Sequence, residues 1–193
     1  VCMPNDVQSD LYLAGQLLIA MPGMRDERFA HSVIYMCAQS DAGALGLVVN
    51  RLAEDMTFPD LMEQLGMGTP DPKDSITVHF GGPVEQSRGF VLHSADYLQD
   101  TTLVVSHDIG LTASLDVLTA IADGSGPKRK LLALGYAGWG PGQLESEILA
   151  NGWIHGPVDE DLLFSSDVNA KWQRSFDAIG LDPAMLSGDF GHA

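Results

Sequence analysis

The most informative stretch of this chain reads Leu134-Gly135-Tyr136-Ala137-Gly138-Trp139-Gly140-Pro141-Gly142-Gln143-Leu144-Glu145-Ser146-Glu147-Ile148. Four glycines and a proline lie here between a hydrophobic run and an amphipathic run. Glycine adopts backbone conformations that are closed to other residues, and proline is favoured at the first position of a helix. The stretch therefore predicts a tightly shaped loop that leads into a helix, with Pro141 as the first helical residue.

Apolar runs upstream of this stretch predict strands, and periodic apolar residues predict helices. The run 131–134 is expected to be a central strand. Thr57 is expected to cap one helix, Thr112 or Ser114 a second, and the stripe within 167–179 marks a last helix. The other strands are expected at 16–21, 31–38, 45–49, 76–80, 89–93 and 102–105.

The order of these elements indicates the fold class. Strands and helices interleave irregularly, with hairpins among them, which favours an α+β fold over a doubly wound parallel sheet. The chain has 193 residues and is 45% hydrophobic, enough for one sizeable core. We expect residues 1–10 to form a flexible polar tail and residues 11–193 to form a single domain.

The charge of the chain is strongly negative. Ten Lys and Arg residues stand against 26 Asp and Glu residues, which gives a net charge of −16. Such a surface repels nucleic-acid backbones and anionic membranes, so we expect neither direct nucleic-acid binding nor a membrane partner. The only dense basic cluster is Lys128-Arg129-Lys130. We interpret that cluster as the solvated start of a strand.

The cysteines and the first apolar run indicate the compartment. Only two cysteines occur, Cys2 and Cys37, so a disulfide framework is not expected and a reducing, cytoplasmic setting fits. The apolar run 11–21 is too short to span a bilayer and has no basic residue ahead of it, which argues against a signal peptide.

Several segments, in order, give the chain a resemblance to the YqgE/AlgH family. They are 15–22, 32–37, 43–50, 81–84, 88–93, 134–147 and the ending Gly191-His192-Ala193. The resemblance implies a single compact α+β unit with a mixed, partly barrel-like sheet surrounded by helices, in the bacterial cytoplasm. One branch of that family carries the label of a transcriptional regulator. Many relatives follow the strand cysteine with Glu-His, whereas here Ala38-Gln39 follow Cys37.

Three side chains are candidates for catalysis. Cys37 lies near the end of an apolar strand without an adjacent activating group, so a buried structural cysteine is favoured over a nucleophile. His93 ends a strand, and a structural role is favoured over an acid/base role there. Glu145 is the best single carboxylate for a polar role, because it is expected at the junction between a loop and a helix.

Other residues are candidates for ligand binding. The turn Gly81-Gly82-Pro83 permits close approach of a ligand or of another strand, and the strand crossing is the favoured interpretation. For Asn50, ligand binding and a structural role in a turn are equally favoured interpretations. For Arg88, an ion pair with an acidic residue of the chain is favoured over binding of a carboxylate or phosphate ligand. The glycine-rich stretch adds Tyr136, Trp139 and Gln143, although packing of the two rings is favoured over anion binding.

Two functions follow as hypotheses. The favoured one is a cytoplasmic binding or regulatory protein that acts through a protein partner or a small ligand. The alternative is an enzyme of unrecognised type, with a cleft built from Gly81-Gly82-Pro83-Val84, His93 and the stretch 135–145. No CxxC, HExxH or tight His/Asp cluster occurs, so the sequence predicts no metal site and no cofactor. It identifies neither the partner nor the oligomeric state.

Overall fold

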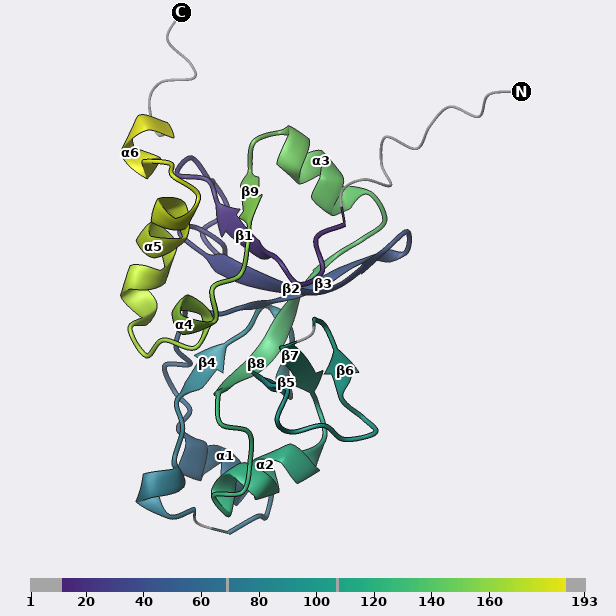
Figure 1. Ribbon diagram of the computed structural model, residues 1–193, viewed down its shortest axis with the longest axis vertical. Helices are drawn as coiled ribbons and strands as arrows, with labels where there is room; N and C mark the ends of the chain where they lie inside the picture. Colours follow the sequence, from purple (N-terminus) through teal and green to yellow (C-terminus); the bar gives the residue numbers. More distant parts are fainter. Residues whose placement is uncertain (1–11, 69, 107, 187–193) are drawn as a thin grey trace, which may run out of the picture.

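The structure is a computed structural model that describes residues 12–68, 70–106 and 108–186 (Figure 1). The predicted tail 1–10 and the ending Gly191-His192-Ala193 lie outside the described residues. The strands are β1 (Leu17–Ala20), β2 (Val33–Ser40), β3 (Gly43–Val48), β4 (Val78–Phe80), β5 (Val84–Ser94), β6 (Leu103–Val104), β7 (Ile109–Thr112), β8 (Lys130–Trp139) and β9 (Trp153–Gly156). The α-helices are α1 (Phe58–Gln64), α2 (Leu115–Ala122), α3 (Gln143–Leu149), α4 (Glu160–Leu163), α5 (Lys171–Ala178) and α6 (Pro183–Leu186), with 3₁₀ turns at Pro72–Asp74 and Val168–Ala170.

One sheet connects the described strands. Its order is β6-β7-β5-β8-β3-β2-β1-β9, and β4 pairs with β8 beside this path. The β4–β8 pair is parallel, and the other pairs are antiparallel, including the predicted hairpin of β2 and β3. The sheet curls into a half-barrel with helices around it, so the predicted α+β fold with a mixed, partly barrel-like sheet is confirmed.

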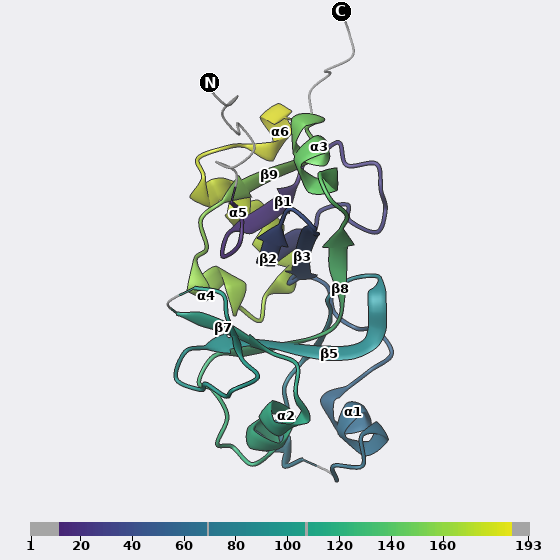
Figure 2. The same cartoon turned by 90° about the vertical axis from the view of Figure 1, so that its right-hand side faces the viewer.

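Strand β8 connects the strands β6, β7, β5 and β4 on one side of the sheet with the strands β3, β2, β1 and β9 on the other. Its first half lies between β4 and β5. Its second half pairs with β3, and Figure 2 shows β8 running from β5 to β3. The predicted loop between Leu134 and Gly140 is therefore wrong, because the strand continues to Trp139. Pro141 is not the first helical residue either, since α3 begins at Gln143 after the N-cap Gly142.

The backbone at Gly81 and Gly82 crosses strand β8 close to Gly135. Gly81 donates its N–H to the carbonyl of Leu134 at 2.7 Å and accepts from the N–H of Val48 at 2.8 Å. Gly135 has φ +76°, and a Cβ there would collide with the carbonyl oxygen of Gly82; a Cβ on Gly82 would collide with the backbone of Tyr136. The strand crossing favoured for Gly81 and Gly82 is what the structure contains, and it explains the glycine at position 135 of β8.

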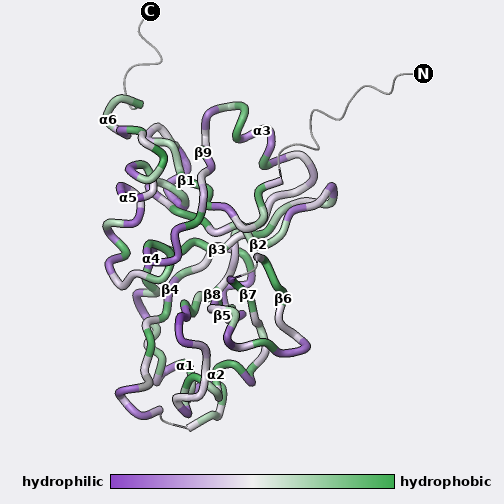
Figure 3. The backbone as a smooth tube through the Cα atoms, viewed as in Figure 1, coloured by the Kyte–Doolittle hydropathy of each residue, from purple (hydrophilic) through white to green (hydrophobic). Residues whose placement is uncertain are grey.

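Three hydrophobic clusters fill the space around the sheet. The first lies under α4 and α5 and includes Tyr35, Leu47 and Phe176; the second lies under α3. The third lies between the sheet and the helices α1 and α2 at the bottom of Figure 1. Most positions of α5 are hydrophilic in Figure 3. Trp172, Phe176 and Ile179 of the predicted helical stripe pack in the first cluster.

Local capping explains where helix α1 begins. Thr57 accepts a hydrogen bond from the N–H of Asp60, and the Asp60 carboxylate accepts from the N–H of Thr57, which is a complete capping box. The short elements β7, β9, α4 and α6 are not among the predicted ones. Among the helices in the described ranges, none combines the length and the apolar character needed to cross a membrane.

Candidate functional site

Part of the predicted site does come together, at the β2–β3 hairpin. Tyr136 and Trp139 line a groove of about 480 Å³ together with Gln39. The Gln39 amide donates to the Glu145 carboxylate at 2.9 Å, and the Gln143 side-chain oxygen accepts from the N–H of Gly140 at 3.0 Å. Glu145 and Gln143 thus hold the end of the hairpin and the start of α3, so their hydrogen bonds serve local structure.

His93 lies elsewhere, fully buried beside β7. Its Nδ1 is 2.9 Å from the carbonyl oxygen of Ser94, which only accepts, so Nδ1 carries the proton. Its Nε2 is 2.7 Å from the Thr112 hydroxyl, which then donates to it. Both ring nitrogens are therefore occupied, and the imidazole does not reach the crossing of Gly81 and Gly82.

The other predicted residues are also separate. Asn50 accepts from the N–H of Val33 at 2.9 Å and donates to the carbonyl of His31 at 2.7 Å, so it ties a turn to the sheet. The exposed Arg88 pairs with Glu85 at 3.5 Å.

Cys37 is buried within the first cluster, and burial raises the pKa of its thiol, which opposes nucleophilic chemistry. Pro83 precedes β5 at the strand crossing. Among the described residues of the proposed enzyme cleft, Val84 lines the groove with Tyr136 and Trp139. His93 lies outside this groove against Ser94 and Thr112, so the cleft is only partly gathered.

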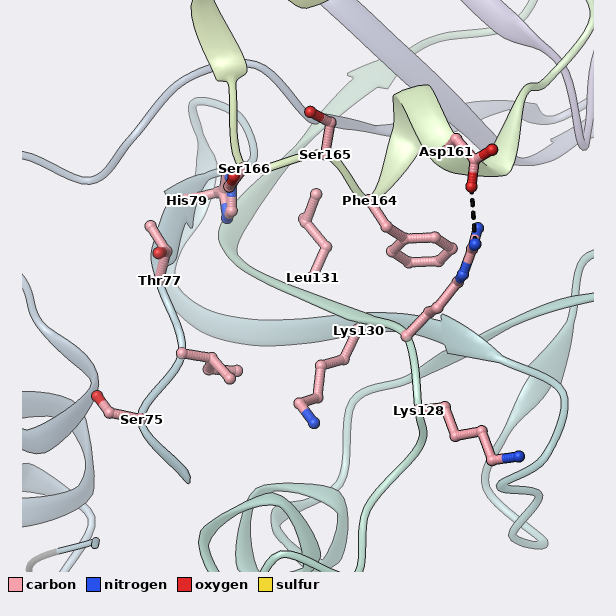
Figure 4. A pocket seen from close by; sticks show the side chains of 12 residues that line it. Ser75, Thr77, His79, Lys128, Lys130, Leu131, Asp161, Phe164, Ser165 and Ser166 are labelled. Carbon is pink, nitrogen blue, oxygen red and sulfur yellow. Dashed lines mark hydrogen bonds and ion pairs between the residues drawn. The ribbon is translucent and has the colours of Figure 1, made fainter. Parts of the chain in front are cut away.

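A second cavity, separate from the groove at the β2–β3 hairpin, is lined by three consecutive basic residues. We call it the basic cavity; it measures about 460 Å³ and opens between β4, the start of β8 and α4 (Figure 4). Its polar lining is mainly cationic and hydroxylic, with one carboxylate and one imidazole, and apolar side chains form a comparable share. The lining consists of Ser75, Ile76, Thr77, His79, Lys128, Arg129, Lys130, Leu131, Asp161, Phe164, Ser165 and Ser166.

The sheet topology assembles this cavity. Strands β4 and β8 are parallel neighbours, with Val78 beside Leu132, so the residues that precede both strands emerge at the same edge. That places Ser75 and Thr77 across from Lys128 and Lys130, which are more than 50 positions away in the chain. Helix α4 and the residues after it cover the third side.

A buried lysine holds that third side in place. The ammonium of Lys171 donates to the carbonyls of Val49 and Leu163, each at 2.8 Å, and so fixes the end of α4 to the sheet. Burial lowers the pKa of Lys171 to about 8. The residues Phe164, Ser165 and Ser166 follow this anchor directly.

The charges of the lining are unbalanced. Lys128, Arg129 and Lys130 face a single carboxylate of the described lining, Asp161, which pairs with Arg129 at 2.7 Å. The Lys130 ammonium donates to the carbonyl of Pro127 at 3.2 Å, and the Lys128 ammonium forms no hydrogen bond or ion pair with a described residue. The lining itself therefore has a formal charge of +2 in a chain of −16. The Asp96 carboxylate, which is outside the lining, accepts from the backbone N–H of Lys128 at 2.9 Å and interacts with the charge of that lysine.

His79 adds a neutral imidazole to the wall. Burial, and next the charge of Lys171, lower the pKa of His79 to about 4, so the ring is uncharged at neutral pH. Its Nδ1 lies 3.2 Å from the carbonyl oxygen of Leu132 and donates to it. Within the described chain, no three His, Cys, Asp or Glu side chains gather as metal ligands would.

Sequence reasoning missed this site, although the signal was present. Three of the ten Lys and Arg residues of the chain are consecutive, at 128–130, and we interpreted them as a solvated strand start. The cluster does begin β8, but its side chains line a cavity. What the sequence does not reveal is the partner wall, because nothing local pairs 75–77 with 128–130.

Comparison with known proteins relates this chain to one protein family. A family model described as AlgH-like (DUF179) matches residues 17–184. A UPF0301 protein of Afipia carboxidovorans is 56% identical over 94% of this chain and 90% of its own, and one of Brucella melitensis is 49% identical over 96% of both chains. None of these names states an activity.

Solved structures extend the comparison. The solution structure of the AlgH protein from Pseudomonas aeruginosa matches with a TM-score of 0.77 and 36% identity, over 100% of this chain and 99% of that one. A crystal structure of a protein from Corynebacterium diphtheriae matches with a TM-score of 0.65 at 22% identity, covering 82% and 84% of the two chains, which shows a shared fold.

Proposed function

The chain belongs to the AlgH-like (DUF179) family, and from that premise we propose that it is a binding protein whose ligand is a small anion held in the basic cavity. In this proposal the protein works in the cytoplasm as a regulator that responds to its ligand. The chemistry of the cavity is recognition, since the described lining offers charges and hydroxyls but no activated nucleophile.

One observation carries the proposal: the charge of the cavity is opposite to that of the chain. A surface with 26 acidic and 10 basic side chains repels anions in general. A cavity whose lining carries +2 therefore creates a local attraction that the remaining surface does not offer. Low-dielectric walls strengthen such an attraction.

The same charges argue for a small ligand over a nucleic acid. Binding to a nucleic-acid backbone needs cations spread along a face, so that several phosphates are contacted together. Here the cations are concentrated in one cavity of about 460 Å³, within the range of small-molecule sites. The surrounding acidic surface would repel the rest of a polyanion.

The test is a thermal-shift titration with inorganic phosphate at constant ionic strength. A ligand at about a hundred times its dissociation constant stabilises by about 2.7 kcal/mol, and a chain of this size then melts several degrees higher. We expect this shift for the natural sequence and its loss in the variant Lys128→Gln/Lys130→Gln.

The matched control removes two positive charges elsewhere. Arg28 and Arg88 are exposed and lie outside the basic cavity. The variant Arg28→Gln/Arg88→Gln has the same formal charge as the cavity variant and should keep the full shift. An equal loss in both variants would show that phosphate responds only to net charge, and the proposal would fail.

A further inference from the structure

The hydrogen-bonding groups of the basic cavity limit which anion it suits. Four hydroxyl groups line it, those of Ser75, Thr77, Ser165 and Ser166, and none of them donates a hydrogen bond within the described chain. The Lys128 ammonium likewise donates to no described group. Ser75, Thr77, Ser166 and Lys128 are exposed, so water accepts from these donors in the free protein, and the oxygens of a bound anion can take its place.

The acceptors already in the cavity do not meet this excess. The Asp161 carboxylate accepts from Arg129, and the Ser165 hydroxyl oxygen accepts from the N–H of Asp167. A monocarboxylate brings two oxygens and one negative charge. A phosphate monoester brings three terminal oxygens and a charge between about −1.5 and −2 at neutral pH, which matches both the donors and the +2 lining.

The cavity is also larger and more apolar than a bare phosphate requires. Ile76, Leu131 and Phe164 form an apolar wall, and Figure 4 shows the Phe164 ring between Leu131 and the arginine that pairs with Asp161. The ring is half-buried and part of it remains open to the cavity. An aromatic face of this kind binds flat apolar groups.

We propose that the natural ligand class is a phosphate monoester, whose phosphoryl group is attracted by the charges of Lys128 and Lys130 and whose organic group lies against Phe164. Figure 4 shows the two ammonium groups and the hydroxyls at different parts of the cavity, so the phosphoryl group contacts only some of them. This inference rests on the proposed function, since it specifies the anion of the same cavity. Arg129 stays with Asp161 and forms the wall beside the ring.

The experiment compares four anions by isothermal titration at constant ionic strength. The probes are phenyl phosphate, benzenesulfonate, benzoate and inorganic phosphate. The first three share a ring and differ in charge and in the number of terminal oxygens. We expect phenyl phosphate to bind at least about tenfold more tightly than either, because benzenesulfonate keeps three terminal oxygens but carries a single negative charge, and benzoate lacks both the third oxygen and the additional charge.

A separate variant tests whether Phe164 binds the organic group of the ligand. Phe164→Leu keeps an apolar side chain in the wall but removes the ring face. We expect it to weaken phenyl phosphate by about fivefold and to leave inorganic phosphate unchanged. Equal affinities of phenyl phosphate and inorganic phosphate in the natural protein would overturn the role of Phe164.

The outcomes separate this inference from the function beneath it. If benzoate and benzenesulfonate bind as tightly as phenyl phosphate, the phosphate monoester is wrong while an anion-binding function stands. If no probe binds, both proposals fail. If phenyl phosphate alone binds tightly and Lys128→Gln/Lys130→Gln abolishes it, both are supported.

Discussion

His79 shows how a single buried residue makes stability depend on pH. Its pKa is about 4 in the folded protein, because burial disfavours the charged ring, against 6.5 for an ordinary histidine. Between these values the unfolded chain binds more protons, so the free energy of unfolding falls as the pH drops from about 6.5 to 4. The shift corresponds to a total loss of roughly 3 kcal/mol.

The variant His79→Asn isolates this effect. An Asn amide can donate to the carbonyl of Leu132 as Nδ1 does, but it does not titrate. Urea unfolding at several pH values between 7.5 and 4.5 should show a flatter dependence for the variant. Asp26 and Asp96 also have a lowered pKa, but they act below this range and remain in both proteins. Parallel curves for the two proteins would contradict this account of His79.

Gly135 tests the backbone crossing. Gly135→Ala forces an alanine to a φ of +76° and drives its Cβ against the carbonyl oxygen of Gly82. Gly180 has a similar φ of +74° but open space around it, so Gly180→Ala carries the backbone penalty alone, about 1 kcal/mol. We expect Gly135→Ala to cost more than about 3 kcal/mol in urea unfolding. Equal costs would mean that the close approach does not constrain β8.

At the scale of elements, helix caps explain which helix ends are specified locally. Thr57 makes both bonds of a capping box, whereas Ser114, at the start of α2, makes no capping bond and its buried hydroxyl has no partner. Thr57→Ala should therefore cost about 1 kcal/mol, and Ser114→Ala should be neutral within about 0.5 kcal/mol. Denaturant midpoints of the two variants check this, and a larger cost at Ser114 would refute it.

The same scale shows where sequence reasoning succeeded and where it failed. The β2–β3 hairpin and helices α1 and α5 have local signals: apolar runs around a turn, a capping residue and a helical stripe. The stretch after Leu134 also has a local signal, its glycine content. The glycine at 135, however, is required by a contact with the backbone of Gly82, which is distant in the sequence. A high glycine content indicates that the backbone needs a special conformation or a close approach. Whether the glycines form a turn or a strand crossing is seen only in the folded structure.

At the scale of the whole molecule, the fold class follows from element order, whereas the site does not. Its two walls are Ser75–Thr77 and Lys128–Lys130, which meet because β4 and β8 are parallel neighbours. No residue near either segment specifies that pairing. The predicted candidates Tyr136, Trp139, Gln143 and Glu145 do share one region, yet His93 and Asn50 hold other parts of the sheet.

We expect anions to bind at the basic cavity and not at the glycine-rich stretch 134–148. The most direct measurement is a map of backbone amide chemical shifts during titration of the ¹⁵N-labelled protein with inorganic phosphate at constant ionic strength. We predict that saturable changes concentrate at 75–79, 128–131 and 164–166, with little change at 136–145. Saturable changes centred on 136–145, or none at either region, would contradict the account.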